Sequence, residues 1–142
     1  MLNDRYNLER FVRAQDAIYP QVLAELRAGR KQTHWIWFIF PQLKGLGSSA
    51  MADEYGIGSR AESEAYIAHP ILGPRLRECT QLVNAVQGRS IEQIFGYPDN
   101  LKFRSSMTLF ALVAGEDNLF QSALDNYYKG EMDQWTVERL KP

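Results

Sequence analysis

A polar stretch near the start of one predicted helix offers the clearest chemistry in this sequence. Lys102, Ser105 and Ser106 lie three or four positions apart and share one face of a helix with Leu109. That face presents one ammonium and two hydroxyl groups, and Arg104 adds a guanidinium beside them. Because such groups donate hydrogen bonds to phosphate and carboxylate, the stretch predicts a binding site for an anionic ligand group.

The same residues have a structural alternative. Lys102 and Arg104 could pair with nearby acids such as Asp99, and both serines could donate to carbonyl groups of the preceding helical turn. The rest of the helix is apolar on several sides and is therefore expected to be buried. Buried charges need partners, which either protein acids or a bound anion can supply. The sequence leaves both interpretations open.

An aromatic segment supplies a second candidate wall. Trp35 and Trp37 could stack on a planar ligand, with His34 before them and Gln42 after them. The alternative is that these rings belong to the core, where most such rings lie. His69, at an expected helix end, is added to the polar wall, although a structural role is the usual one there. The predicted ligand-binding residues are His34, Trp35, Trp37, Gln42, His69, Arg75, Lys102, Arg104, Ser105 and Ser106.

Several other chemistries lack their residues. The chain has two histidines and one cysteine, and neither C-x-x-C nor H-E-x-x-H occurs, so we expect no metal. No P-loop or dinucleotide fingerprint occurs, and we expect no cofactor. The segment Gly45–Ser49 is glycine-rich, but Asp53 and Glu54 follow it and would repel a phosphate. A catalytic serine triad has no G-x-S-x-G motif to support it, and we assign no catalytic residue.

Helices must position these residues, because helical signals recur from end to end. Apolar residues spaced three and four apart predict two helices before residue 29. Ser59 with Glu62 and Ser90 with Gln93 match the capping box. Further helices are expected at about residues 49–55, 59–69, 74–87, 90–95, 99–114, 118–128 and 133–140, the 118–128 helix being capped by Asn118.

One segment departs from the helical pattern. The β-branched and aromatic residues of Trp35–Phe40 favour a strand, and the segment is short. The predicted fold class is therefore all-α, a single compact multi-helix domain with at most one short strand. The residues expected to be mostly buried in its core include Trp37, Phe103, Met107 and Phe110.

Length and composition agree with one domain, residues 1–142. Of the 142 residues, 45% are hydrophobic and 23% are charged, which is near the globular average and argues against disorder. The net charge of -1 disfavours nucleic acid as a partner. The longest apolar run, Trp35–Phe40, is too short to span a membrane. The single cysteine, Cys79, fits the reducing cytoplasm, where we expect the protein to be located.

Several longer phrases occur together and carry a family resemblance. They are His34–Leu43 with Gly45–Gly47, Tyr66–Leu76, Ile94–Gly96 with Asp99, and Leu101–Phe110. With these phrases the chain resembles, over about residues 6 to 128, a bacterial family of small domains of unknown function that is sometimes labelled calpastatin. The resemblance implies a mostly helical fold and favours a helix for the aromatic segment. The calpastatin label is set aside, because inhibitors of that class are long, repeated and disordered.

Two functional hypotheses follow. The first is a small-molecule pocket, binding or hydrolytic, for a phosphate-bearing ligand of nucleotide or ADP-ribose type. The second is a non-enzymatic interaction or structural module in which the same residues are core and ion pairs. The two hypotheses differ in whether the ten predicted side chains converge on one open cleft or are buried with one another. The sequence names neither the ligand nor the oligomeric state.

Overall fold

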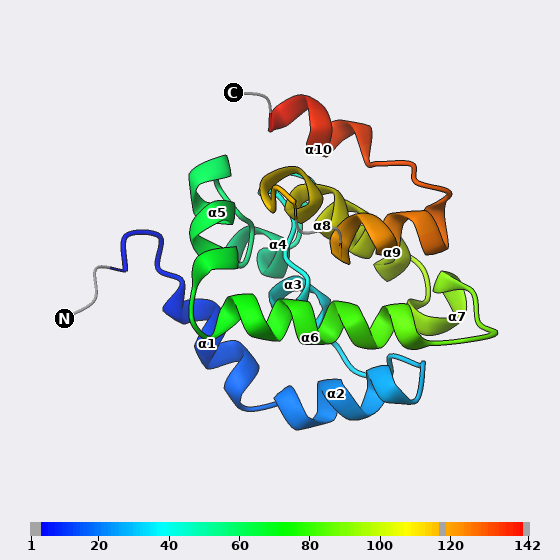
Figure 1. Ribbon diagram of the computed structural model, residues 1–142. Helices are drawn as coiled ribbons and strands as arrows, with labels where there is room; N and C mark the ends of the chain where they lie inside the picture. Colours follow the sequence, from blue (N-terminus) through cyan, green and yellow to red (C-terminus); the bar gives the residue numbers. More distant parts are fainter. Residues whose placement is uncertain (1–3, 117–118, 141–142) are drawn as a thin grey trace.

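The computed structural model describes residues 4–116 and 119–140, and helices dominate this part of the chain (Figure 1). Ten helices and no β-strand are formed there, and 63% of the described residues are helical. The helices are α1 (Glu9–Asp16), α2 (Tyr19–Arg27), α3 (Ile36–Ile39), α4 (Ala50–Glu54), α5 (Arg60–Ala68), α6 (Leu72–Ala85), α7 (Ile91–Phe95), α8 (Asp99–Val113), α9 (Leu119–Tyr128) and α10 (Gln134–Arg139). The predicted all-α class is confirmed, whereas the expected cap Asn118 lies outside the described residues.

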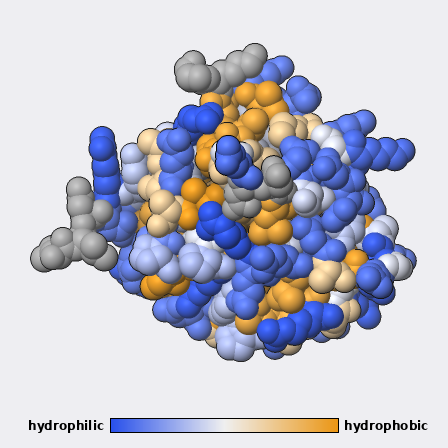
Figure 2. All heavy atoms as spheres, in the orientation of Figure 1, coloured by the Kyte–Doolittle hydropathy of each residue, from blue (hydrophilic) through white to orange (hydrophobic). Residues whose placement is uncertain are grey.

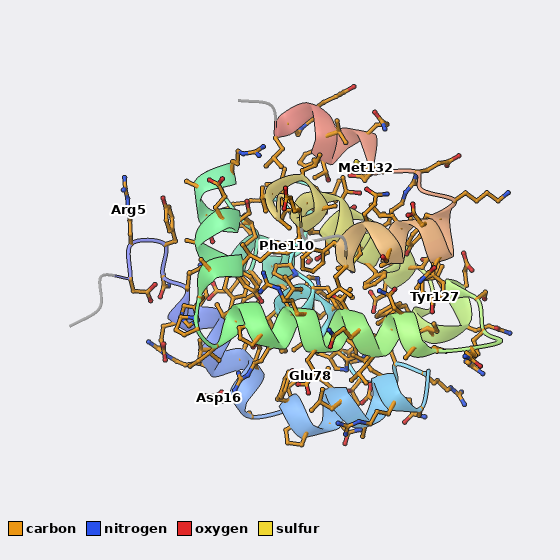
Figure 3. All side chains as sticks on the ribbon, viewed as in Figure 1. Arg5, Asp16, Glu78, Phe110, Tyr127 and Met132 are labelled. Atoms are coloured by element: carbon orange, nitrogen blue, oxygen red, sulfur yellow. The ribbon has the colours of Figure 1, made fainter. Side chains whose placement is uncertain are left out.

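Helix α8 is the centre of the packing. It contacts α9, α5, α10 and α7, while α6 crosses the front of the molecule and packs on α9, α5 and α2 (Figure 1). The α8 side chains of Phe103, Met107 and Phe110 are fully buried, as predicted. Figure 3 shows Phe110 near the middle of the molecule. Trp37, also expected in the core, is only partly buried.

The aromatic segment forms the one-turn helix α3, as the family resemblance implies and against the strand that its residue types favour. Side chains from α1 and α2 hold it at both ends. Gln15 Nε2 donates to the Phe38 carbonyl (2.7 Å), and the Trp35 indole donates to Glu25 Oε1 (3.0 Å). These tertiary hydrogen bonds outweigh the local preference for extended backbone.

Two predicted caps position neighbouring helices. Ser90 and Gln93 form a complete capping box at α7, with bonds of 3.2 and 2.8 Å between each side chain and the other residue's N–H. Ser59 Oγ accepts from the Glu62 N–H (3.1 Å), but the Glu62 carboxylate binds Arg10 (2.9 Å) instead of the Ser59 N–H. The box at Ser59 is therefore only half formed, because the Glu62 carboxylate accepts from the Gly58 N–H (2.9 Å) and pairs with Arg10, which is distant in the sequence.

The face drawn in Figure 2 is covered largely by hydrophilic residues, with hydrophobic residues between them in several smaller areas. Among the described residues, the large hydrophobic side chains that are exposed are Ile71, Tyr97 and Leu101. No helix in the described part of the chain is long and apolar enough to cross a lipid bilayer.

Candidate functional site

A cavity of about 320 Å³ lies where the loop after α3 meets the first turns of α8 and the start of α10. We call it the Lys102 cavity. Its lining residues are Gln42, Leu46, Gly47, Pro98, Leu101, Lys102, Arg104, Ser105 and Asp133. Four of the ten predicted residues line it: Gln42, Lys102, Arg104 and Ser105. One residue of the predicted aromatic wall therefore meets the polar start of α8 here.

Backbone pairing holds the loop that forms one wall. The only bridge between extended residues in the described chain is a parallel one, Leu43 to Ile57, where Ile57 N donates to Gln42 O (2.9 Å) and Lys44 N to Ile57 O (2.8 Å). A Cβ on Gly47 would lie 2.8 Å from the Ala52 Cβ, so only glycine lets the loop pack this closely on α4. Backbone hydrogen bonds and close packing therefore hold this wall of the cavity in place.

Lys102 has an incomplete set of partners. Its Nζ lies 3.5 Å from Asp99 Oδ1 and 5.0 Å from the centre of a Trp37 ring. The other oxygen of Asp99 is 2.7 Å from Nζ of Lys31, whose side chain is only 6% exposed. One carboxylate therefore serves two ammonium groups. The structural alternative, pairing of Lys102 with Asp99, is observed, but it leaves one positive charge in excess.

Arg104, by contrast, makes its hydrogen bonds to other groups of the protein. Its Nε donates to the Glu131 carbonyl (2.9 Å) and its Nη2 to the Met132 carbonyl (3.1 Å), and the Glu131 carboxylate lies 3.5 Å away. The guanidinium therefore ties the segment before α10 to α8. This residue matches the structural alternative rather than a free anion-binding group.

The two serines differ, and only Ser105 matches one of the two interpretations. Ser105 Oγ donates to the Leu101 carbonyl one turn earlier (3.1 Å), as the structural alternative predicts. Ser106 Oγ is fully buried and has no hydrogen-bond partner among the described residues. Ser106 does not line the cavity.

Two more polar groups beside Lys102 are unsatisfied. Gln42 is 6% exposed, its Oε1 is buried without a partner, and no described residue bonds its Nε2 either. The Trp37 Nε1–H is also buried without a partner in the described chain. Most buried polar groups in folded proteins are hydrogen-bonded, so this group of free polar atoms needs an explanation.

Sequence reasoning missed Asp133 and the apolar lining of the cavity. Asp133 Oδ2 accepts from the Thr136 N–H (3.1 Å) and hydroxyl (2.6 Å) and caps α10. An Asp three residues before a Thr is a recognisable cap signal. Its place in the cavity depends on Arg104 and on Thr108, whose Oγ1 accepts from the Asp133 N–H (2.9 Å), and no local pattern reveals those contacts.

The predicted wall residue Trp35 is core. Its side chain is fully buried, and its indole donates to Glu25. Glu25 also accepts from the side chain of Gln21 (2.9 Å), the N–H of Gln32 (2.7 Å), and the N–H (3.1 Å) and hydroxyl (2.7 Å) of Thr33. Burial works to raise the pKa of Glu25, but hydrogen bonds from Gln32, Gln21 and Thr33 outweigh it and lower the pKa to about 2.

Arg75 also lies away from the Lys102 cavity. Its guanidinium contacts Asp16 Oδ1 (2.9 Å) and Gln15 Oε1 (3.2 Å) and lies 4.8 Å from the centre of the Tyr19 ring. Figure 3 shows Asp16 at the end of α1 and Glu78 on the side of α6 that faces α2. Arg75 thus joins α6 to the first two helices.

The two histidines do not reach the cavity. His69 Nδ1 accepts from the N–H groups of Ile71 (3.1 Å) and Leu72 (3.2 Å) and caps α6. It lines a different cavity of about 530 Å³, together with the segment 4–9. His34 is exposed. The described residues hold no group of three or more His, Cys, Asp or Glu side chains that could bind a metal ion.

Comparison with known proteins gives relatives without an assigned activity. A family model described as a protein of unknown function (DUF1810) matches residues 5–140. The crystal structure of the conserved hypothetical protein Rv1873 from Mycobacterium tuberculosis is similar to this chain at 58% sequence identity and a TM-score of 0.95. The match covers 96% of this chain and 98% of that one. No curated protein matches. The predicted resemblance to a family of unknown function is confirmed.

Proposed function

We propose that this chain, which belongs to the DUF1810 family of proteins of unknown function, binds a small molecule through an oxyanion group at Lys102. One observation carries the proposal: Lys102 lines a cavity and shares its carboxylate partner, Asp99, with Lys31. Lys31 is the closer lysine, at 2.7 Å against 3.5 Å, and takes the stronger attraction. The positive charge of Lys102 that Asp99 does not neutralise is best neutralised by an anionic group of a ligand.

The other charged residues of the cavity support this assignment, because their own partners occupy them. Arg104 is bound to two carbonyls and lies near the Glu131 carboxylate, and Asp133 is bound to Thr136. Asp133 therefore caps a helix rather than neutralising Lys102. Of the charges that line the cavity, two are positive and one is negative, which favours an anion.

The cavity volume and its apolar residues narrow the ligand class. A volume of about 320 Å³ is near the lower end of the range for small-molecule sites, roughly 300–1,000 Å³. Leu46, Pro98 and Leu101 add apolar surface beside the charge. We therefore favour a phosphate-bearing metabolite of nucleotide or sugar-phosphate size over a larger ADP-ribose-like one. The proposal is confined to binding, and the unbonded Ser106 hydroxyl takes no part in it, because Ser106 is fully buried and does not line the cavity.

A thermal-shift titration with inorganic phosphate and ribose 5-phosphate tests the proposal. A ligand at about 100 times its Kd stabilises a folded protein by about 2.7 kcal/mol. Lys102→Met should abolish this stabilisation and leave the unliganded melting temperature within a few degrees of wild type. Lys44→Met is the matched control, because Lys44 is an exposed lysine that lies 3.8 Å from Asp53 and does not line the cavity. Equal stabilisation of wild type and Lys102→Met, or none of either, would refute the site.

An interaction module is the second candidate. Tyr97 is 80% exposed and Leu101, on the cavity rim, is 46% exposed, and exposed apolar side chains of this size can mark protein contacts. Sedimentation of the wild type over a range of concentrations tests self-association. A mass that rises with concentration and is restored to the monomer value by Leu101→Ser supports this candidate; a constant monomer mass counts against self-association.

A cytoplasmic location is also part of the proposal. Its support is the single cysteine, Cys79, which is free and buried. Burial raises the pKa of the Cys79 thiol to about 12, so the thiol stays protonated and unreactive at neutral pH. The net charge of -1 gives no reason to propose a nucleic-acid partner.

A further inference from the structure

We propose that the ligand of the Lys102 cavity also carries a planar edge on which an N–H donor and a carbonyl acceptor lie side by side, and that the carboxamide of Gln42 binds this edge. Nucleobases and carboxamides present such edges. The inference rests on the proposed function, because it names a second group on the molecule whose oxyanion Lys102 binds.

The state of the Gln42 side chain carries the inference. Gln42 lines the cavity, is 6% exposed, and no described residue donates to its Oε1 or accepts from its Nε2. A buried amide oxygen without a hydrogen bond destabilises the fold, so a glutamine with a purely structural role is expected to have a partner there. The free carboxamide belongs to a residue that lines the Lys102 cavity and is therefore available to a ligand there.

The main chain of Gln42 is anchored beside the cavity. Gln42 O accepts from Ile57 N (2.9 Å) at the bridge that anchors the loop. A Cβ built on Gly47 would lie 3.6 Å from Gln42 Nε2, so the loop passes close to the amide at this glycine. The backbone carbonyl of Gln42 is therefore bonded within the fold, while its side chain is free for recognition.

The oxygen and the nitrogen of the Gln42 carboxamide determine which ligand group can pair with it. A carboxamide offers one acceptor and two donors, and it pairs side by side with a group that offers one donor and one acceptor. Which end of the amide is nitrogen does not matter, because both ends are free and the paired edge carries both kinds of group. Glutamine binds nucleobase edges in this bidentate way in protein–DNA complexes.

Calorimetric titration with four phosphate compounds tests the inference. Ribose 5-phosphate and phenyl phosphate carry the oxyanion without the edge, whereas uridine 5′-monophosphate and 3-carbamoylphenyl phosphate carry both. We expect the compounds with the edge to bind wild type about tenfold more tightly or better, which corresponds to about 1.4 kcal/mol or more. The last two compounds separate a nucleobase from an open carboxamide as the source of the edge.

Variants test whether Gln42 causes the preference for the compounds that carry the edge. Gln42→Leu should bind all four compounds with the weaker affinity and should melt at or above the wild-type temperature, since it removes an unsatisfied buried amide. Gln42→Met repeats the test with an unbranched side chain if the leucine variant does not fold. Gln81→Leu, an exposed glutamine on α6, is the matched control and should keep the full discrimination.

The outcomes separate the two proposals. If wild type binds all four compounds equally and Lys102→Met binds none, the oxyanion site stands and the role of Gln42 is refuted. If Gln42→Leu keeps the tenfold preference, another group binds the edge and the inference is likewise refuted. If no compound binds, both proposals fall.

Discussion

Two neighbouring tryptophans have opposite surroundings. Trp35 donates its indole N–H to Glu25, a buried carboxylate that accepts five hydrogen bonds in all, whereas the buried Trp37 N–H has no partner in the described chain. The two lysines on Asp99 show the same contrast: Lys31 pairs closely, and Lys102 only loosely. Satisfied polar groups beside Trp35 stabilise the fold. Unsatisfied ones beside Trp37 mark where a ligand is expected.

Replacing Glu25 by alanine should give the largest effect. Glu25→Ala removes the charged acceptor of five hydrogen bonds, and since hydrogen bonds to charged groups contribute about 1.5–3 kcal/mol each, we expect a loss of at least about 3 kcal/mol in unfolding free energy. Urea denaturation measures it. Glu9→Ala removes a carboxylate that is 51% exposed and should change stability by less than about 0.5 kcal/mol. A loss near 1 kcal/mol for Glu25→Ala would show that water replaces this carboxylate.

The pH dependence of stability should report the same carboxylate. The folded protein lowers the pKa of Glu25 from 4.5 to about 2, so the folded state binds fewer protons than the unfolded state between these values. The stabilisation is complete above about pH 5 and is lost as the pH falls to 2, with a total of roughly 3 kcal/mol. Glu25→Gln should lose this contribution. Melting curves from pH 6 to 2 that run parallel for the two proteins would contradict it.

Replacing the two lysines that pair with Asp99 should give different losses of stability. Lys31→Met removes the close partner of Asp99 in a nearly buried position and should cost about 1–3 kcal/mol. Lys102→Met removes a looser, more exposed pair and should cost less than about 1 kcal/mol. Equal losses in urea denaturation would mean that Asp99 is shared evenly, and the excess charge at Lys102 would lose its basis.

The sequence predicts the fold better than the site, for physical reasons. The cap at Ser90 and the buried face of α8 follow from local patterns, and so do the positions of Lys102 and Ser105 on one helix face. Hydrogen-bond partners often come from distant parts of the chain. Trp35 has one and, in the described chain, Trp37 has none, because Glu25, in another helix, reaches only Trp35. The pattern leaves open whether Arg104 binds an anion or a protein group, and its partners lie in the segment before α10. Arg75 likewise binds residues of α1, about 60 positions away in the sequence, whereas the partners of His69 are the nearby N–H groups of Ile71 and Leu72.

The smallest expected difference in unfolding free energy is that between variants of the two tryptophans. Trp35→Phe removes one donor from Glu25 and shrinks a fully buried ring, so it should cost about 1–3 kcal/mol. Trp37→Phe removes an N–H that has no partner and keeps an aromatic ring below Lys102, so it should cost less than about 1 kcal/mol. Urea denaturation of both variants measures the difference.

A cost for Trp37→Phe as large as that for Trp35→Phe would mean that the Trp37 N–H is bonded in solution, and the contrast between the two regions would fail. Phosphate sharpens the contrast further. An oxyanion at Lys102 should be bound more weakly by Trp37→Phe, which changes the ring 5.0 Å from Lys102 Nζ, and equally well by Trp35→Phe. Because the two substitutions are chemically identical and lie two residues apart, a difference in phosphate stabilisation between them reports the surroundings of each indole rather than the loss of the indole itself.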